Sequence, residues 1–180
     1  MANFGQVIWI TGLSGTGKST LGKELASCLR NEFYSVIMLD GDELREIFGA
    51  SEVNEQNYSR NCRLALAMKY SKLCKTLANQ GLNVVIATIS LFKEIHLWNR
   101  SSIPGYYEVY MKVPISVLRR RDSKKIYQQY DTGMLKNVAG LDLIIDEPTN
   151  ADLVLEYQPD ISVKDLAKKL TKTIRRRICK

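Results

Sequence analysis

The sequence lacks several features that mark other classes of protein. None of the apolar runs in its 180 residues approaches the ~20 residues needed to span a bilayer. No basic segment precedes an apolar stretch near Met1, so we expect no secretory signal. None of the four cysteines forms a C-x-x-C pair, and no histidine–cysteine spacing is typical of a zinc site. These absences favour a cytoplasmic protein with reduced cysteines and no membrane span.

The charge balance is uneven, because 26 lysines and arginines outnumber 19 acidic residues and give a net charge of +7. Much of the excess lies in two clusters, at 119–125 and at 168–180. Basic clusters can bind phosphates, nucleic acid or an anionic surface, but a solvated helix face is the commoner explanation. We therefore expect no nucleic-acid partner. A nucleotide-dependent nucleic-acid-binding or regulatory module without kinase activity remains the alternative to an enzyme.

Apolar strand-like runs alternate with helical patterns along the chain. Strands are predicted at 6–11, 35–39, 83–89, 106–113 and 151–155, and helices at 18–30, 57–79, 94–101, 115–121 and 163–178. This alternation predicts an α/β fold, with a doubly wound, mainly parallel sheet and helices on both faces, in a single domain over residues 1–180. Between Asp122 and Pro148 the periodicity fails. We therefore expect a mobile lid over about 122–148, called the lid segment below.

The first predicted strand leads into a segment that matches G-x-x-x-x-G-K-[ST] in full, at Gly12–Ser19. Its glycines let the backbone wrap a phosphate at the positive end of the following helix. Lys18 would contact the β- and γ-phosphate oxygens, and the Ser19 hydroxyl would take one Mg²⁺ position. We predict that ATP is bound by Gly12, Ser14, Gly15, Thr16, Gly17, Lys18, Ser19 and Thr20.

An acidic segment, Asp40-Gly41-Asp42-Glu43-Leu44-Arg45, ends the second predicted strand. Strand ends of this fold place side chains in the ligand crevice, where one carboxylate can orient Mg²⁺ and the other can accept a hydroxyl proton. Arg45 lies one helical turn beyond Asp42 and can bind an acceptor phosphate. The GTPase strings D-x-x-G and N-K-x-D are absent. A small P-loop chain with this acidic pair favours a small-molecule kinase.

Together with three further motifs, these segments resemble the adenylylsulfate (APS) kinase family. The further motifs are R-D-S-K-K-I-Y at 121–127, G-M-L-K-N-V-A-G-L-D at 133–142 and E-P-T-N-A-D-L-V-L at 147–155. That family transfers the γ-phosphoryl group of ATP to the ribose 3′-hydroxyl of adenosine 5′-phosphosulfate (APS). The resemblance implies a P-loop α/β fold with a mobile lid, ATP and Mg²⁺ as cofactors, a small-molecule nucleotide acceptor and a homodimer.

The resemblance also implies roles for individual residues. Asp42 matches the general base, and Lys18 is the second catalytic residue. We assign Asp40, together with Ser19, to the metal. Arg121 matches a lid residue beside the ATP. The acceptor-binding positions fall on Arg45, Tyr58, Asn61, Ser90, Phe92, Lys124, Lys136 and Val138.

The departures from the family pattern cluster on the acceptor side. Val138 stands where a phenylalanine stacks on the adenine of APS, and Tyr58 replaces an acceptor-binding arginine, for which Arg60 or Arg63 is a substitute. His96, the only histidine, replaces another arginine, and we expect it to be structural. One branch of the family, the cytidine diphosphoramidate kinases of bacterial capsule synthesis, phosphorylates the same hydroxyl of a smaller base. The sequence therefore leaves two candidate acceptors, APS and cytidine diphosphoramidate.

Overall fold

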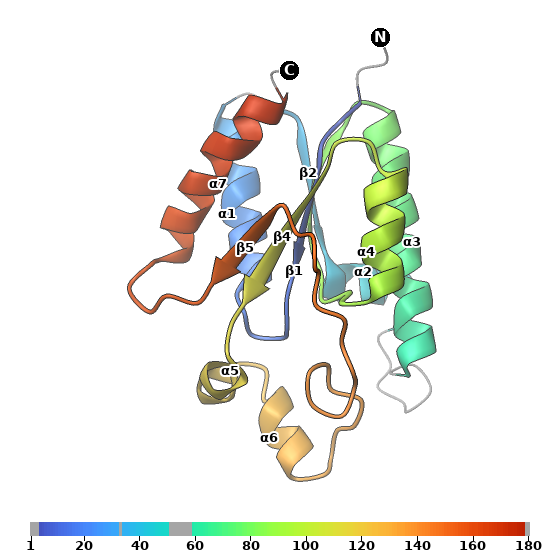
Figure 1. The fold of residues 1–180 in the computed structure, drawn as a ribbon, viewed down its shortest axis with the longest axis vertical. Coiled ribbons are helices and arrows are strands. Elements are labelled where there is room, and N and C mark those ends of the chain that lie inside the picture. Colours follow the sequence, from blue (N-terminus) through green and yellow to red (C-terminus); the bar gives the residue numbers. More distant parts are fainter. Residues whose placement is uncertain (1–3, 33, 51–58, 179–180) are drawn as a thin grey trace.

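A five-stranded parallel sheet lies at the centre of the structure, in the order β2-β3-β1-β4-β5 (Figure 1). The computed structural model describes residues 4–32, 34–50 and 59–178. Its strands are β1 (Val7–Thr11), β2 (Val36–Asp40), β3 (Asn83–Ala87), β4 (Tyr106–Lys112) and β5 (Leu153–Glu156). The strand order reverses at β1, so the crevice at the carboxyl end of β1 is where a ligand of this fold binds. The predicted doubly wound sheet is confirmed.

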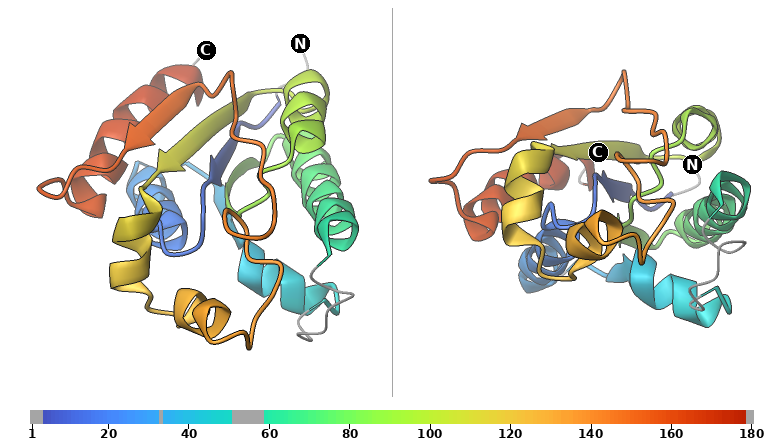
Figure 2. Two further views of the ribbon diagram at one scale, coloured as in Figure 1. Left: turned by 60° about the horizontal axis from the view of Figure 1, so that its bottom comes forward. Right: turned by 90° about the horizontal axis from the view of Figure 1, so that it is seen from below.

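Helices cover both faces of the sheet. One face packs against α1 (Lys18–Asn31) and α7 (Val163–Ile178), and the other against α3 (Arg60–Asn79) and α4 (Lys93–Ser102). All five residues of β1 are buried, as expected for a parallel strand covered on both sides. Three short helices, α2, α5 and α6, lie beyond the carboxyl ends of the strands (Figure 2). Their bounds are Gly41–Ile47, Ile115–Arg121 and Ile126–Asp131.

The ends of α3 follow from its sequence. The Ser59 side chain accepts a hydrogen bond of 3.4 Å from the Cys62 amide and so caps the first turn. At the other end Gly81 takes φ 80°, and the amides of Gly81 and Leu82 donate to the carbonyls of Ala78 and Leu77. This is the Schellman arrangement, in which a glycine with positive φ ends the helix. Residues 57 and 58, where the helix was predicted to begin, lie outside the described residues.

Two further expectations need correction. The third strand ends at Ala87 instead of at Ile89, because the chain turns sharply at Ser90, which has φ 28°. The lid segment was predicted to lack regular structure, yet it contains α6. Asp122 explains this helix, since its carboxylate accepts hydrogen bonds from the amides of Tyr127 at 3.2 Å and Gln128 at 2.9 Å.

The basic tail forms the exposed face of α7. Its apolar side packs on α1 through Ala167, Leu170 and Ile174. Arg175 reaches Glu32 at 3.8 Å, and the Arg177 guanidinium lies 4.9 Å from the ring centre of Tyr107. Two arginines of the tail therefore have partners within the chain itself. No helix within the described ranges is long and apolar enough to cross a membrane.

Candidate active site

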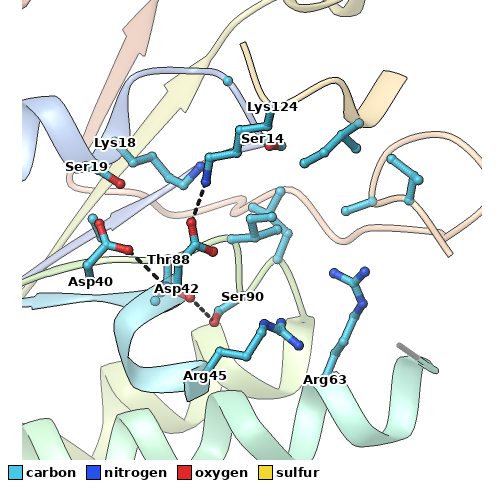
Figure 3. Close-up of a pocket in the computed structure, with 18 of the residues that line it drawn as sticks. Ser14, Lys18, Ser19, Asp40, Asp42, Arg45, Arg63, Thr88, Ser90 and Lys124 are labelled. Carbon is cyan, nitrogen blue, oxygen red and sulfur yellow. Dashed lines mark hydrogen bonds and ion pairs between the residues drawn. The ribbon is translucent and has the colours of Figure 1, made fainter. Parts of the chain in front are cut away.

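A cavity of about 650 Å³ opens at the carboxyl ends of β1, β2 and β3 (Figure 3). The phosphate loop forms one end of the cavity, and α2 and α3 form its floor. Residues 123–145 of the lid segment close it from the other side. The cavity therefore brings together segments from five separate parts of the sequence, as expected for a site between a sheet edge and a lid.

The phosphate loop takes the backbone shape that its glycines allow. Gly15 and Gly17 have φ angles of 80° and 95°, and α1 begins at the next residue, Lys18. A Cβ on Gly12 would lie 2.7 Å from the Met111 carbonyl oxygen, so only glycine fits there. The first amides of α1 thus face the cavity at the positive end of the helix, where an anion binds. The Tyr127 hydroxyl donates to the Ser14 carbonyl at 3.0 Å and ties α6 to this loop.

Lys18 is the buried cation of the site. Its side chain is 9% exposed, and its Nζ donates to the Leu13 carbonyl at 2.6 Å. Burial, together with the nearby charge of Lys124, lowers the pKa of Lys18 from 10.5 to about 7, although Asp42 and Asp40 act in the opposite direction. A buried ammonium with so low a pKa needs a strong anion beside it, and a nucleotide phosphate supplies that charge.

Two carboxylates stand at the end of β2, as predicted. Asp40 is buried, and its Oδ1 accepts a hydrogen bond of 2.9 Å from the Asp42 amide, which caps α2. The Asp42 carboxylate is exposed to the cavity and forms an ion pair with Lys124 of the lid segment. Ser19 and Asp40 line the same end of the cavity, beside Lys18 (Figure 3).

The donor set at this end fits Mg²⁺. Mg²⁺ usually keeps several waters and takes one or two protein oxygens together with substrate phosphates. A hydroxyl from Ser19 and a carboxylate from Asp40 match that demand. Among the described residues no group of three or more His, Cys, Asp or Glu side chains could hold a metal ion by itself. The site thus suits a metal that arrives with the phosphates.

The far end of the cavity carries hydroxyls and arginines. Thr88 and Ser90, both 6% exposed, share a hydrogen bond of 2.8 Å. The positive φ of Ser90 is held by bonds on either side: the Thr11 hydroxyl donates to the Ile89 carbonyl, and the Phe92 amide donates to the Ser90 carbonyl. Strain of this kind concentrates at functional sites.

Arg45 and Arg63 both line this end of the cavity, and their guanidinium groups lie on the same side of it (Figure 3). Arg63 also donates to the Asn137 carbonyl of the lid segment at 2.8 Å. Arg60 instead contacts Glu94 at 3.1 Å and Asp146 at 3.3 Å. Of the two candidate substitutes for the arginine replaced by Tyr58, it is therefore Arg63 that reaches the cavity.

Most of the predicted site residues line the cavity, and some do not. Those that do include Ser14, Gly15, Gly17, Lys18, Ser19, Thr20, Asp40, Asp42, Arg45, Ser90, Phe92, Lys124 and Val138. Gly12 and Thr16 belong to the phosphate loop but do not line the cavity; the Thr16 hydroxyl donates to the Leu13 carbonyl at 3.0 Å. Asn61 and Lys136 are exposed and lie outside the cavity wall, and Tyr58 falls outside the described residues. Arg121 lies over the Tyr157 ring, 4.9 Å from its centre.

Sequence reasoning missed several residues of the wall. Thr88 follows β3 directly, so the strand-end rule that pointed to Asp40 and Asp42 could have found it. Gln129 and Leu135 come from the lid segment, where no periodicity indicated which side chains turn inward. Only the fold brings these residues to the cavity.

A parallel sheet with a phosphate loop after β1, a carboxylate pair after β2 and a segment folded over both defines a P-loop phosphotransferase. The family model described as adenylylsulphate kinase matches residues 4–156, and the chain belongs to that family. It is therefore a nucleotide-binding kinase, and a P-loop module without kinase activity is no longer the alternative.

Individual relatives refine this picture. The chain is 39% identical over 175 residues to the cytidine diphosphoramidate kinase of Campylobacter jejuni, covering 93% of this chain and 99% of that relative. It is 33% identical over 163 residues to the adenylyl-sulfate kinase of Pseudomonas aeruginosa, covering 88% and 81%. The solved structure of the Mycobacterium tuberculosis APS kinase CysC, in complex with AMPPNP and APS, superimposes with a TM-score of 0.85 at 29% identity, covering 96% of this chain and 98% of that one.

Proposed function

We propose that the protein transfers the γ-phosphoryl group of ATP to the ribose 3′-hydroxyl of a nucleoside 5′-anhydride, in a Mg²⁺-dependent reaction. One observation carries the proposal. A single cavity has the phosphate loop and Lys18 at one end, Arg45 and Arg63 at the other, and the Asp42 carboxylate between them. A donor and an acceptor bound at these two ends would meet at Asp42.

At the donor end, the loop amides and Lys18 bind the β- and γ-phosphates. Phosphate binding restores the charge of Lys18, because the new anion raises its lowered pKa. Ser19 and Asp40 would hold Mg²⁺, which when bound would neutralise charge on the transferred phosphoryl group. Tyr127 and Lys124 connect the lid segment to this end and help to exclude water, the competing acceptor.

Asp42 acts on the acceptor hydroxyl. Its carboxylate is exposed to the cavity and paired with Lys124 in the free protein. When the acceptor enters, the hydroxyl replaces Lys124 as the hydrogen-bond partner, and the carboxylate orients it and takes its proton. Lys124 is then released toward the phosphates, where its charge complements that of the reacting group.

The acceptor we favour is cytidine diphosphoramidate. Of the apolar side chains that line the cavity, we assign Phe92, at 5% exposed, and Val138, at 4%, to the base. Tyr70, the other aromatic residue of the wall, donates its hydroxyl to the Gly41 carbonyl at 3.2 Å. A pyrimidine needs less stacking area than a purine, so one aromatic ring with a small aliphatic partner suits cytosine. The relative with this activity also matches at higher identity and over nearly its whole length. Arg45 and Arg63 would bind the charged 5′-anhydride.

APS is the second candidate, supported by the adenylyl-sulfate kinase relatives and by the TM-score of 0.85 to a structure holding APS. Release of ADP from ATP with each acceptor in parallel separates the two. We expect a kcat/KM for the cytidine compound at least tenfold above that for APS. A higher kcat/KM for APS would overturn the choice of acceptor but leave the phosphoryl transfer intact. A homodimer, implied by the resemblance, is tested by the mass in light scattering.

A further inference from the structure

His96 on α4 makes two hydrogen bonds that together determine where its protons are. Its Nδ1 lies 2.7 Å from Oε1 of Glu108 on β4, and its Nε2 lies 2.9 Å from the carbonyl oxygen of Asp146, at the end of the lid segment. A carbonyl and a carboxylate are both acceptors, so each ring nitrogen has to donate. A neutral imidazole beside an ionised carboxylate has one proton too few to make both contacts. The two contacts therefore form together only when the His96–Glu108 pair carries one additional proton.

Glu108 is the buried charge that this proton balances. Its side chain is 3% exposed and lies in the middle of β4, where a carboxylate without partners would be costly. The Tyr106 hydroxyl donates to its Oε1 at 3.0 Å, and Nη2 of Arg100 lies 3.6 Å from its Oε2. The short contact with His96 is thus the closest cationic partner that the structure gives Glu108.

The second contact of His96 reaches the point where the lid segment returns to the sheet. The Asp146 amide donates to the Leu91 carbonyl at 3.0 Å, and its carboxylate accepts from the Lys93 amide at 3.1 Å and from Arg60 at 3.3 Å. The residue before it, Ile145, lines the cavity, as does Leu91. Asp146 therefore fixes the lid segment directly beside the cavity wall.

We propose that His96 is a positioning residue that, when protonated, clamps the end of the lid segment onto Glu108 of β4 and opens this clamp on losing its proton. Once the proton is lost, the ring can donate to only one of its two acceptors. Either Glu108 loses its close partner or the Asp146 carbonyl is released, and Ile145 is then held less firmly in the wall. The effect on catalysis rests on the proposed function, whereas the clamp itself does not.

The charges around His96 set the pH at which the clamp opens. Burial by itself lowers the pKa of His96, but the hydrogen bond and charge of Glu108, with the carbonyl and charge of Asp146, outweigh it, so the pKa lies above 6.5. The other charged groups nearby come from every neighbouring element. They are Arg100 and Glu94 of α4, Arg60 of α3, and Asp152 before β5, which pairs with Arg100 at 2.6 Å.

The sign follows from the raised pKa. The stabilisation from the clamp is fully present below pH 6.5 and is lost as the pH rises through the higher pKa of the folded protein. The clamp is therefore closed at low pH and opens as the pH rises through the pKa of His96.

The chain offers a direct test, because His96 is its only histidine and its ring signals in an NMR spectrum of untagged protein need no assignment. We expect a titration midpoint above 6.5. Over the same pH range the protection of the Asp146 amide against hydrogen exchange, corrected for intrinsic exchange, should fall by about tenfold, the loss expected of a hydrogen bond to a charged group. A midpoint at or below 6.5, or protection that does not follow the titration, would overturn the proposal.

Two variants and a control sharpen the test. His96→Gln should lack the pH-dependent change in protection, and Glu108→Gln, which keeps an acceptor but removes the charge, should lower the His96 midpoint. Lys112→Met removes the neighbouring exposed ion pair to Glu147, at 3.1 Å, and should behave as the wild type. An unchanged midpoint in Glu108→Gln would contradict the clamp.

Activity gives a separate readout. The acceptor KM of the wild type should rise with pH around the His96 midpoint, whereas that of His96→Gln should be high and independent of pH. Absence of turnover with either acceptor would defeat the proposed function alone, because the NMR and exchange measurements still decide on the clamp. A wild-type acceptor KM that ignores the midpoint, in an active enzyme, would show that the clamp does not position the site.

Discussion

Replacing Lys18 by methionine should stabilise the nucleotide-free protein while abolishing catalysis. The drop of the Lys18 pKa from 10.5 to about 7 means that burying this side chain costs about 4 kcal/mol at pH 7.5, at 1.36 kcal/mol per pKa unit. The hydrogen bond to the Leu13 carbonyl offsets roughly 0.5 to 1.5 kcal/mol of that cost, because the buried amine is mostly neutral at this pH. The variant should therefore gain about 3 kcal/mol, or roughly 6 to 12 °C in melting temperature.

The stability that Lys18→Met gains over the wild type should decrease as the pH rises. Between pH 7 and 10.5 the unfolded chain keeps a proton on Lys18 that the folded protein has lost, so the wild type gains stability as the pH rises. The cost of burial falls from about 5 kcal/mol at pH 6 to about 2 kcal/mol at pH 9. The advantage of the variant should therefore shrink to about 1 kcal/mol at pH 9.

Thermal melting of the two proteins at pH 6, 7.5 and 9, with and without ATP and Mg²⁺, measures both effects. Nucleotide at a hundredfold excess over its Kd should stabilise the wild type by about 2.7 kcal/mol and the variant far less. Lys23→Met, the same change at an exposed position of α1, is the control and should alter little. A melting temperature of Lys18→Met several degrees below that of the wild type at pH 7.5 would refute the reasoning.

Three further predictions concern the acceptor and the chemistry. Asp42→Asn should abolish turnover while ATP affinity in calorimetry stays nearly unchanged; retained turnover would remove the base assignment. Val138→Phe should raise the kcat/KM for APS relative to the cytidine compound by roughly 5- to 150-fold, the value of one stacked base, provided that its melting temperature shows a folded protein. Arg63→Met should raise the acceptor KM about tenfold with an unchanged ATP KM, and an equal effect of Arg60→Met would contradict the distinction between the two arginines.

The donor end of the site could be predicted because its chemistry is local. The motif fixes the spacing of its glycines, Lys18 and Ser19. The strand before it and the helix after it then determine the conformation of the loop. The same holds for Asp40, which caps α2 and sets the position of Asp42 within three residues. Here the order along the chain is enough to set the geometry.

The acceptor end could be predicted only in part, since its contacts join distant segments. Arg63 and the Asn137 carbonyl are 74 residues apart, and nothing near either residue indicates the other. A match to a family position likewise did not bring Asn61 into the cavity wall, because the first turn of α3 turns it to solvent. Tertiary packing decides these cases, and local sequence does not encode it.

The lid segment gives the same lesson. The six residues of α6 are too few for a helical period to be visible, and its first turn is held by two hydrogen bonds to the Asp122 carboxylate. The partners of His96 lie 12 and 50 residues away, so the sequence indicated a lone histidine on α4 and no more.

The most direct test of the central claim is the position of the transferred phosphate. The protein is incubated with ATP, Mg²⁺ and either cytidine diphosphoramidate or APS, and phosphorus NMR of the product locates the new phosphate. We predict a ribose 3′-phosphate on the cytidine compound, formed faster than on APS and absent with Asp42→Asn. A phosphate at another position, or no ATP-dependent product with either acceptor, would contradict the account.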